Sequence, residues 1–244
     1  MKFSEFKYER PDYSRIRIQF EDLVKSMEDS KSYEELKKNI DEINKLRNHI
    51  ESMATLVSIR YSINTSDEFY EKEKEHWDEN GPHYEELNSL FYKQIVNSKF
   101  KEELTKDLGK QFMSIADYSL QAFSKEIISE LQEENKLASE YTKLLASAKI
   151  PFDGEERNLS GLGPYMTSPF RDEREKASKA YYGYFEENEE KFDEIFDKLV
   201  KLRHKMAKKL GFDNFVQLGY IRMLRTDYNS EMVAKFRKQV SEYI

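Results

Sequence analysis

One apolar stripe, repeated at helical spacing over six turns, restricts the possible folds of this chain more than any other feature. Ser32 precedes it, and Glu35 follows Ser32 at the spacing of a capping box, which is typical of a helix N-terminus. A period of about 3.6 residues puts all the apolar side chains on one helical face. The stripe consists of Leu36, Ile40, Ile43, Leu46 or Arg47, Ile50, Met53 and Val57. The sequence therefore predicts one long amphipathic helix here.

Turn-forming residues are scarce along the whole chain. Eight glycines and five prolines occur among 244 residues, whereas these two residue types make up roughly 12% of an average protein. Charged residues account for 36% and hydrophobic residues for 38%, a balance typical of helices that bury one stripe and leave a wide polar face in water. The composition therefore predicts an all-α fold made mainly of long antiparallel helices.

Helix start and stop signals divide the rest of the chain. Asp12 is placed to cap the first helix, and Gly211 is placed to end a later one as its C′ residue. A helical stretch runs from Asp67 toward Asn97, and Gly81-Pro82 either kinks it or splits it. Further helices are expected over residues 99–107, 109–120, 125–147, 186–210 and 213–224, and Asn229 or Ser230 is expected to cap a last one.

Residues 149–160 are the one break in this helical pattern. Asp153-Gly154 is a strong turn pair, and its short flanks favour β-strands. Pro151 would then have to lie on an edge. The sequence therefore predicts one small β-hairpin near residues 149–160. It also predicts a division into an N-terminal helical region, residues 1–148, and a second region, residues 149–244.

Charge and cysteine content exclude several classes of partner and site. The net charge is −7, and neither region offers the strongly basic surface that nucleic-acid binding needs, so no nucleic acid is expected. No run approaches 18 apolar residues, so no membrane contact is expected either. Cysteine is absent, which excludes disulfides and cysteine-based zinc sites and fits a reducing compartment. We therefore expect a cytoplasmic protein.

The sequence offers no self-sufficient catalytic or metal-binding group. None of the four histidines belongs to an H-E-x-x-H motif. His76, Glu79 and His83 share a helical face, but Gly81-Pro82 lies between them, and exposed surface is the favoured interpretation. Glu73 and His76 form a single Glu-x-x-His pair, whereas di-iron bundles need two. Paired carboxylates such as Glu102-Glu103 and Glu133-Glu134 are interpreted as solvated surface. We therefore predict no catalytic residue and no metal ligand in this chain.

The C-terminal third resembles the oligoendopeptidase F family of thimet-oligopeptidase-like zinc metallopeptidases. Many residues carry the resemblance, in order, over about ninety positions. They are Ile150-Pro-Phe-Asp-Gly-Glu-Glu, Leu159-Ser160, Pro164-Tyr165, Ser168, Arg171-x-x-Arg174-x-x-Ala177, Leu199-Val-Lys-Leu-Arg-His-Lys-Met-Ala-Lys-Lys-Leu-Gly-Phe212, Asn214-Phe215, Leu218-Gly-Tyr-Ile-Arg-Met-Leu-Arg-Thr-Asp-Tyr228 and Phe236-Arg-Lys-Gln-Val240.

The resemblance implies a mostly helical enzyme whose two halves enclose a channel that admits short peptides. In that family, zinc is held by the two histidines of H-E-x-x-H and a downstream Glu, all C-terminal to the residues matched here. This chain would then be the N-terminal part of a zinc-dependent oligoendopeptidase that hydrolyses internal bonds of short peptides. Residues 149–244 would begin the helical peptidase domain and stop before the zinc motif. We expect this chain to be inactive without the C-terminal catalytic half. Its expected partners are short peptides and that catalytic half.

The same resemblance suggests where peptides bind. The candidates for lining or bracing the channel are Tyr220, Arg222, Arg225 and Tyr228, because Arg suits a peptide carboxylate through two parallel hydrogen bonds. The alternative is structural: Arg222 or Arg225 pairs with Asp227 and holds a junction between helices.

Two further expectations complete the interpretation. If the catalytic half is absent, the final helix should expose apolar side chains, namely Met232, Val233, Phe236 and Val240. The alternative function is that of a non-enzymatic helical binding or scaffold protein, because long amphipathic helices without a catalytic motif also allow it.

Overall fold

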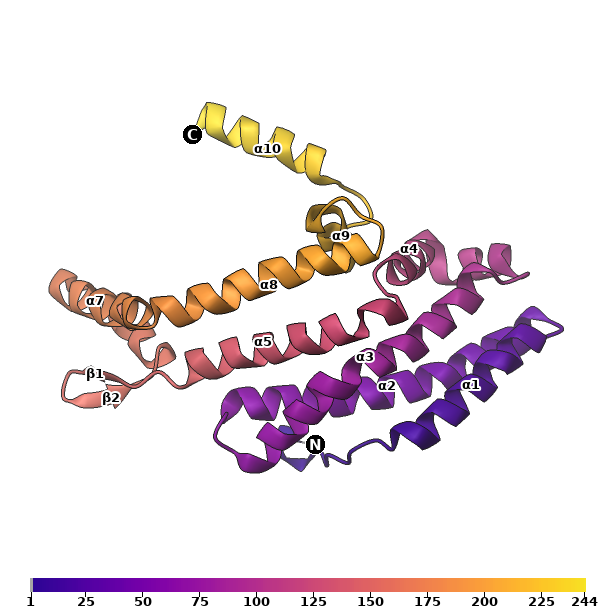
Figure 1. The fold of residues 1–244 in the computed structure, drawn as a ribbon, viewed down its shortest axis with the longest axis horizontal. Helices are drawn as coiled ribbons and strands as arrows, with labels where there is room; N and C mark the ends of the chain where they lie inside the picture. The colour runs from indigo at the N-terminus through magenta and orange to yellow at the C-terminus, as the bar shows by residue number, and fades with distance from the viewer. Residues whose placement is uncertain (1) are drawn as a thin grey trace.

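The computed structural model describes residues 2–244, which form ten α-helices, three short 3-10 helices and one two-stranded sheet (Figure 1). The predicted all-α fold with one small hairpin is confirmed. The α-helices are α1 (Tyr13–Asp29), α2 (Tyr33–Ile63), α3 (Glu68–Val96), α4 (Lys101–Gln121), α5 (Ile128–Ala146), α6 (Gly163–Met166), α7 (Arg171–Glu187), α8 (Glu189–Lys209), α9 (Phe215–Arg222) and α10 (Ser230–Tyr243). The 3-10 helices are η1 (Phe3–Glu5), η2 (Lys125–Ile127) and η3 (Ser160–Leu162).

Helices α1 to α4 share the largest hydrophobic core. The predicted stripe of α2 faces it: Leu36, Ile40, Ile43 and Val57 are buried. Ser32 caps α2 as expected, since its hydroxyl accepts the Glu35 N–H at 3.2 Å. The side chains at the centre of this core have no measurable exposure and include Phe20, Ile43, Phe91, Ile95 and Leu104. In Figure 1, α1, α2 and α3 form the lower, indigo-to-purple part of the molecule, and α4 lies above them on the right.

Helix α3 is continuous through Pro82, so of the two predicted alternatives, a kink or a split, the split is wrong. Proline has no N–H, and it therefore leaves the carbonyl four residues earlier without its helical donor. That carbonyl belongs to Asp78, and it accepts the side-chain amide of Asn135 in α5 at 3.1 Å. The next carbonyl, that of Glu79, accepts the amide of Gln132 at 2.8 Å. Helix α5 thus supplies donors where the proline disturbs α3.

The backbone divides α4 where the sequence predicts a division. Gly109 has non-helical geometry, with φ of 86° and ψ of 157°, so α4 consists of two helical parts that meet at this residue, as expected for residues 99–107 and 109–120. One predicted boundary differs slightly from the structure. Helix α9 is capped by Asn214 and not by Asp213, because the Asn214 side chain accepts the Val216 N–H at 2.8 Å.

The hairpin forms where it is predicted. Strands β1 (Ile150–Phe152) and β2 (Glu155–Arg157) pair antiparallel, with Pro151 opposite Glu156. Asp153 and Gly154 have φ values of 52° and 79°, as a two-residue turn with positive φ at both central positions requires. Pro151 is tolerated because each strand of a two-stranded sheet is an edge. Figure 1 shows the hairpin beside α7, at one end of the molecule.

Helix α8 ends at Gly211 as predicted. The Gly211 N–H bonds to the Lys208 carbonyl at 3.1 Å and the Phe212 N–H bonds to the Ala207 carbonyl at 2.9 Å, which together form a Schellman motif. Gly211 has φ of 84°. Helix α9 ends in the same hydrogen-bond pattern, but Leu224 occupies the equivalent position at φ 54°.

Gly211, at the end of α8, and Gly183, inside α7, allow a matched pair of substitutions. An added Cβ at Gly211 would meet nothing within 4 Å, so Gly211→Ala tests the backbone alone and is expected to lower the free energy of unfolding by about 1 kcal/mol. Gly183 lies inside α7, also with open space around it, and Gly183→Ala should raise stability by about 0.5–1 kcal/mol. Urea denaturation followed by circular dichroism measures both. Equal signs for the two changes would contradict this assignment.

Helix α10 extends away from the other helices (Figure 1). None of its residues is buried. Met232, Phe236 and Val240 are 51%, 63% and 39% exposed, so the expected apolar exposure of the final helix is confirmed at these positions. Helix α8 also exposes apolar side chains, Phe196 and Val200. No helix within residues 2–244 is long and apolar enough to span a membrane.

Candidate functional site

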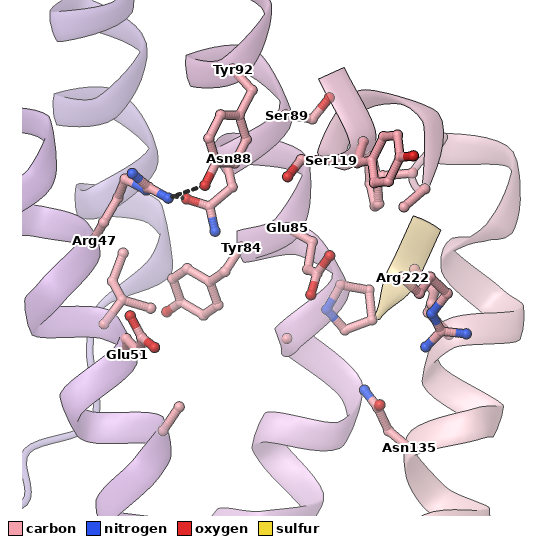
Figure 2. Close-up of a pocket in the computed structure, with 18 of the residues that line it drawn as sticks. Arg47, Glu51, Tyr84, Glu85, Asn88, Ser89, Tyr92, Ser119, Asn135 and Arg222 are labelled. Carbon is pink, nitrogen blue, oxygen red and sulfur yellow. Dashed lines mark hydrogen bonds between the residues drawn. The ribbon is translucent and has the colours of Figure 1, made fainter. Parts of the chain in front are cut away.

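A pocket of about 760 Å³ lies where α2, α3, α4, α5 and α9 meet. Figure 2 shows its side chains converging from these helices. Aromatic groups line it, including Trp77, Tyr84 and Tyr92 of α3, together with the polar side chains of Ser119 and Asn135. Its size and its mixture of apolar surface with a few polar groups are typical of sites that bind small organic molecules or short peptides.

Arg47 forms a fixed cation on the α2 side of the pocket. Its Nε donates to Asn88 at 2.9 Å, and its two terminal nitrogens donate to Asn44 at 2.9 Å and to the Tyr92 hydroxyl at 2.8 Å. The guanidinium carbon also lies 4.5 Å from the centre of the Phe91 ring. Within residues 2–244, no carboxylate forms an ion pair with Arg47.

Glu51 and Glu85 bring two carboxylates into the same pocket. Both residues are exposed, and neither has a hydrogen-bond or ion-pair partner within the described part of the chain. Burial by the surrounding protein raises the pKa of Glu85; the nearby Arg222 opposes this effect and the charge of Glu134 adds to it. Glu85 is thus an exposed carboxylate that lies between the walls of a concave pocket, and no cation of the described residues is bound to it.

Glu134 of α5 joins α5 to α8 and α9 on the other side of the pocket. It is 5% exposed. One oxygen accepts from Arg203 Nε at 2.6 Å, and Arg222 donates to both oxygens, at 2.7 and 3.2 Å. Burial favours the neutral acid, but the two arginines outweigh that effect and lower the pKa of Glu134. The two guanidinium carbons also lie 5.7 and 5.9 Å from the Phe215 ring centre.

Glu130 repeats this arrangement one turn earlier on α5. It is 2% exposed, and Lys205 and Lys209 of α8 both approach one of its oxygens at 2.8 Å. Burial alone would raise the pKa of Glu130, but hydrogen bonds from the two lysines lower it to about 2. The basic second half of α8 therefore does more than complement the helix dipole, because these side chains tie α8 to α5.

The four residues predicted to contact a peptide lie in and beyond α9. Arg222 lines the pocket, while its guanidinium is held by Glu134. The Tyr220 and Tyr228 rings meet edge to face at 6.1 Å, and the Arg225 guanidinium carbon lies 5.7 Å from the Tyr228 ring centre. The structure brings these four residues into one segment, but only Arg222 borders the pocket.

The alternative, a structural role for these arginines, is correct for Arg222, but the predicted partner of Arg222 is wrong. Arg222 does hold a junction between helices, but through Glu134 and not Asp227. The interpretation of Glu134 as solvated surface is also wrong, although it holds for its exposed neighbour Glu133. Glu51, Glu85 and Glu134 were not predicted as site residues. The sequence gives one indication of a role for Arg47: it is a charged residue at a position of the apolar stripe, which indicates a special environment.

The metal-ligand candidates of α3 are engaged elsewhere or isolated. Glu73 accepts from Arg10 at 2.6 and 2.9 Å and from the Tyr8 hydroxyl at 2.5 Å. Nε2 of His76 is buried and has no hydrogen-bond partner among the described residues. Residues 2–244 contain no group of three or more histidine or acidic side chains placed to hold a metal ion. The described residues therefore do not fit a zinc site.

Comparison with known proteins places this fold in a family. The family model for the Peptidase M3 N-terminal domain matches residues 3–123. Among solved structures, PZ peptidase A with an inhibitor is 50% identical with a TM-score of 0.95. A protein described as an oligoendopeptidase F from Bacillus anthracis strain Ames is 47% identical with a TM-score of 0.95. No curated protein matches the sequence.

A third similar structure, also described as an oligoendopeptidase F, is 46% identical with a TM-score of 0.96. All three matches cover 100% of this chain, which spans 43–45% of the length of those proteins. The family model, the identities and the agreement of the folds lead to one assignment: this chain belongs to the oligoendopeptidase F family of M3 peptidases and corresponds to its N-terminal region.

Proposed function

We propose that this chain is the N-terminal part of a zinc-dependent oligoendopeptidase and forms one wall of the channel in which short peptides are cleaved. The observation that carries this proposal is the pocket between α2, α3, α4, α5 and α9, in a chain whose relatives include peptidases. Its volume of about 760 Å³ suits a segment of a few residues. Its aromatic walls, with Arg47, Glu51 and Glu85, offer both apolar surface and groups for peptide ends.

The proposal assigns the catalytic chemistry to the remainder of the parent protein. Zinc would be held there, by residues outside this chain, and would supply an activated water for hydrolysis. Residues 149–244 would be the start of the helical peptidase domain. The exposed apolar side chains of α8 and α10, such as Phe196 and Phe236, would be covered by that catalytic half. Four residues would brace the contact between this chain and the catalytic half and the channel beside it, namely Tyr220, Arg222, Arg225 and Tyr228.

A graft tests the proposal most directly. Residues 1–244 replace the corresponding segment of the Bacillus anthracis relative, to which they are 47% identical. The chimera is expected to hydrolyse a quenched fluorescent peptide and to lose that activity in the presence of a zinc chelator. Residues 1–244 alone are expected to show no cleavage with or without added zinc, because no metal-binding group is assembled within the described residues.

Two results would contradict the proposal. Zinc-dependent cleavage by residues 1–244 alone would place the catalytic site in this chain. A chimera that folds and binds zinc but cleaves no peptide would instead favour the non-enzymatic scaffold alternative. Circular dichroism and a zinc titration establish folding and loading before activity is measured. Cytoplasmic location, which the absence of cysteine supports, is part of the same proposal and is tested by cell fractionation.

A further inference from the structure

Glu85 differs from the buried glutamates within residues 2–244 because no Arg or Lys side chain holds it. Glu73, Glu130 and Glu134 are each held by at least one Arg or Lys side chain at 2.6–2.8 Å. Glu85 points into the pocket (Figure 2) and has no such partner within the described residues. Arg222, whose charge acts on Glu85, already donates to both oxygens of Glu134.

The walls of the pocket surround Glu85, although its side chain is exposed to solvent. A carboxylate surrounded by protein loses part of its hydration, and burial accordingly raises its pKa. A cation that enters the pocket would restore the lost interaction, because hydrogen bonds to charged groups are stronger than those between neutral groups. Glu51 lies in the same pocket, also without a cation among the described residues, and it adds negative potential.

We propose that Glu85 binds an organic ammonium group, and that the N-terminal ammonium of a peptide is the group it takes. The assignment to a peptide rests on the proposed function, whereas the preference for an ammonium group rests on the pocket alone. The aromatic walls next to Glu85, formed by Trp77 and Tyr84, suit the apolar body of a molecule whose charged end meets the carboxylate. Glu85 would thereby select substrates by the distance from the N-terminus to the cleaved bond.

Trp77 provides the measurement. It is the single tryptophan of the chain, it lines the pocket, and it is 8% exposed, so its fluorescence reports what enters. Residues 1–244 are titrated with a tetrapeptide that has a free N-terminus, with its N-acetylated form, and with an N-acetylated form that carries one lysine. The free peptide is expected to bind about tenfold more tightly than the acetylated one, the factor that corresponds to about 1.4 kcal/mol.

Glu85→Gln should remove this tenfold preference, because glutamine keeps the size and hydrogen-bonding capacity of the side chain and loses its charge. Glu75→Gln is the matched control: Glu75 is an exposed residue of the same helix and lies outside this pocket, so this variant should keep the full preference. If the acetylated lysine peptide also binds tightly, and Glu85→Gln weakens it, the ammonium group is recognised from a side chain as well as from the N-terminus.

The outcomes separate this inference from the proposed function. Equal affinities of wild type and Glu85→Gln for the free and acetylated peptides would overturn the role of Glu85 and leave the peptidase assignment intact. Absence of binding by every cationic probe, including a simple alkylamine, would also overturn it. Selective binding of ammonium groups through Glu85, together with an inactive graft, would instead contradict the proposed function and leave the binding site standing.

Discussion

Replacement of Phe91 by alanine is expected to lower the free energy of unfolding by about 3–5 kcal/mol. Phe91 has no measurable exposure and lies in the core that α1 to α4 share. Its removal leaves a cavity in the core that α1 to α4 share, and a cavity adds to the cost of lost burial. It also removes the ring on which the Arg47 guanidinium lies, 4.5 Å from its centre. The substitution should therefore loosen the α2 side of the pocket as well.

Trp77 belongs to the same core as Phe91, so urea denaturation followed by its fluorescence measures the loss directly. Phe196→Ala is the control, because it makes the same chemical change at a side chain of α8 that is 69% exposed. That variant is expected to differ from wild type by about 1 kcal/mol or less. Similar losses for the two variants would show that burial in this core does not dominate the stability of the α1–α4 region.

The secondary structure was largely predictable because local rules determine most of it. The helical period alone predicts the buried stripe from Leu36 to Val57. The hairpin turn at Asp153-Gly154 depends only on two residues that adopt positive φ, and the end of α8 depends only on positive φ at Gly211. Pro82 is the exception. A local rule predicts a kink or a break there, but Asn135, fifty residues further along the chain, provides the donor that the Asp78 carbonyl accepts. No local pattern contains that information.

The pocket was less predictable because residues of six helices, from α1 to α9, contribute to it. Glu133 and Glu134 are adjacent and chemically identical, yet Glu133 is exposed and Glu134 is buried, with 5% of its surface exposed. The difference arises from Arg203 and Arg222, which lie on α8 and α9. In a chain with 36% charged residues, the exposed alternative is the common one for any single Glu. Only the packing of α8 and α9 on α5 identifies Glu134 as the buried carboxylate. The tertiary structure is likewise needed to identify Glu85 as a carboxylate that lines the pocket.

Glu134→Ala is expected to lower the free energy of unfolding by about 2–3 kcal/mol. Removal of one member of a buried ion pair commonly costs 3–5 kcal/mol, because the remaining charge is left buried and unpaired. Here the expected cost is smaller, since the side chains of Arg203 and Arg222 are 39% and 32% exposed and can be hydrated. Hydrogen exchange should become faster in α8 and α9, the helices that Glu134 joins to α5. Glu133→Ala, the neighbouring control, should change stability by about 0.5 kcal/mol or less.

Acid provides an independent measurement of the same contact. The pKa of Glu134 is lowered in the folded state, and that of Glu130 is lowered to about 2. A carboxylate of this kind stabilises the fold above its unfolded pKa of about 4.5, and that stability is lost as the pH falls through the folded pKa. Wild type and Glu134→Ala should therefore differ most near pH 7 and converge toward pH 2, because protonation removes the same charge as the substitution. A difference in stability that stays constant from pH 7 to pH 2 would show that packing of the Glu134 side chain, and not its charge, holds α5 against α8 and α9.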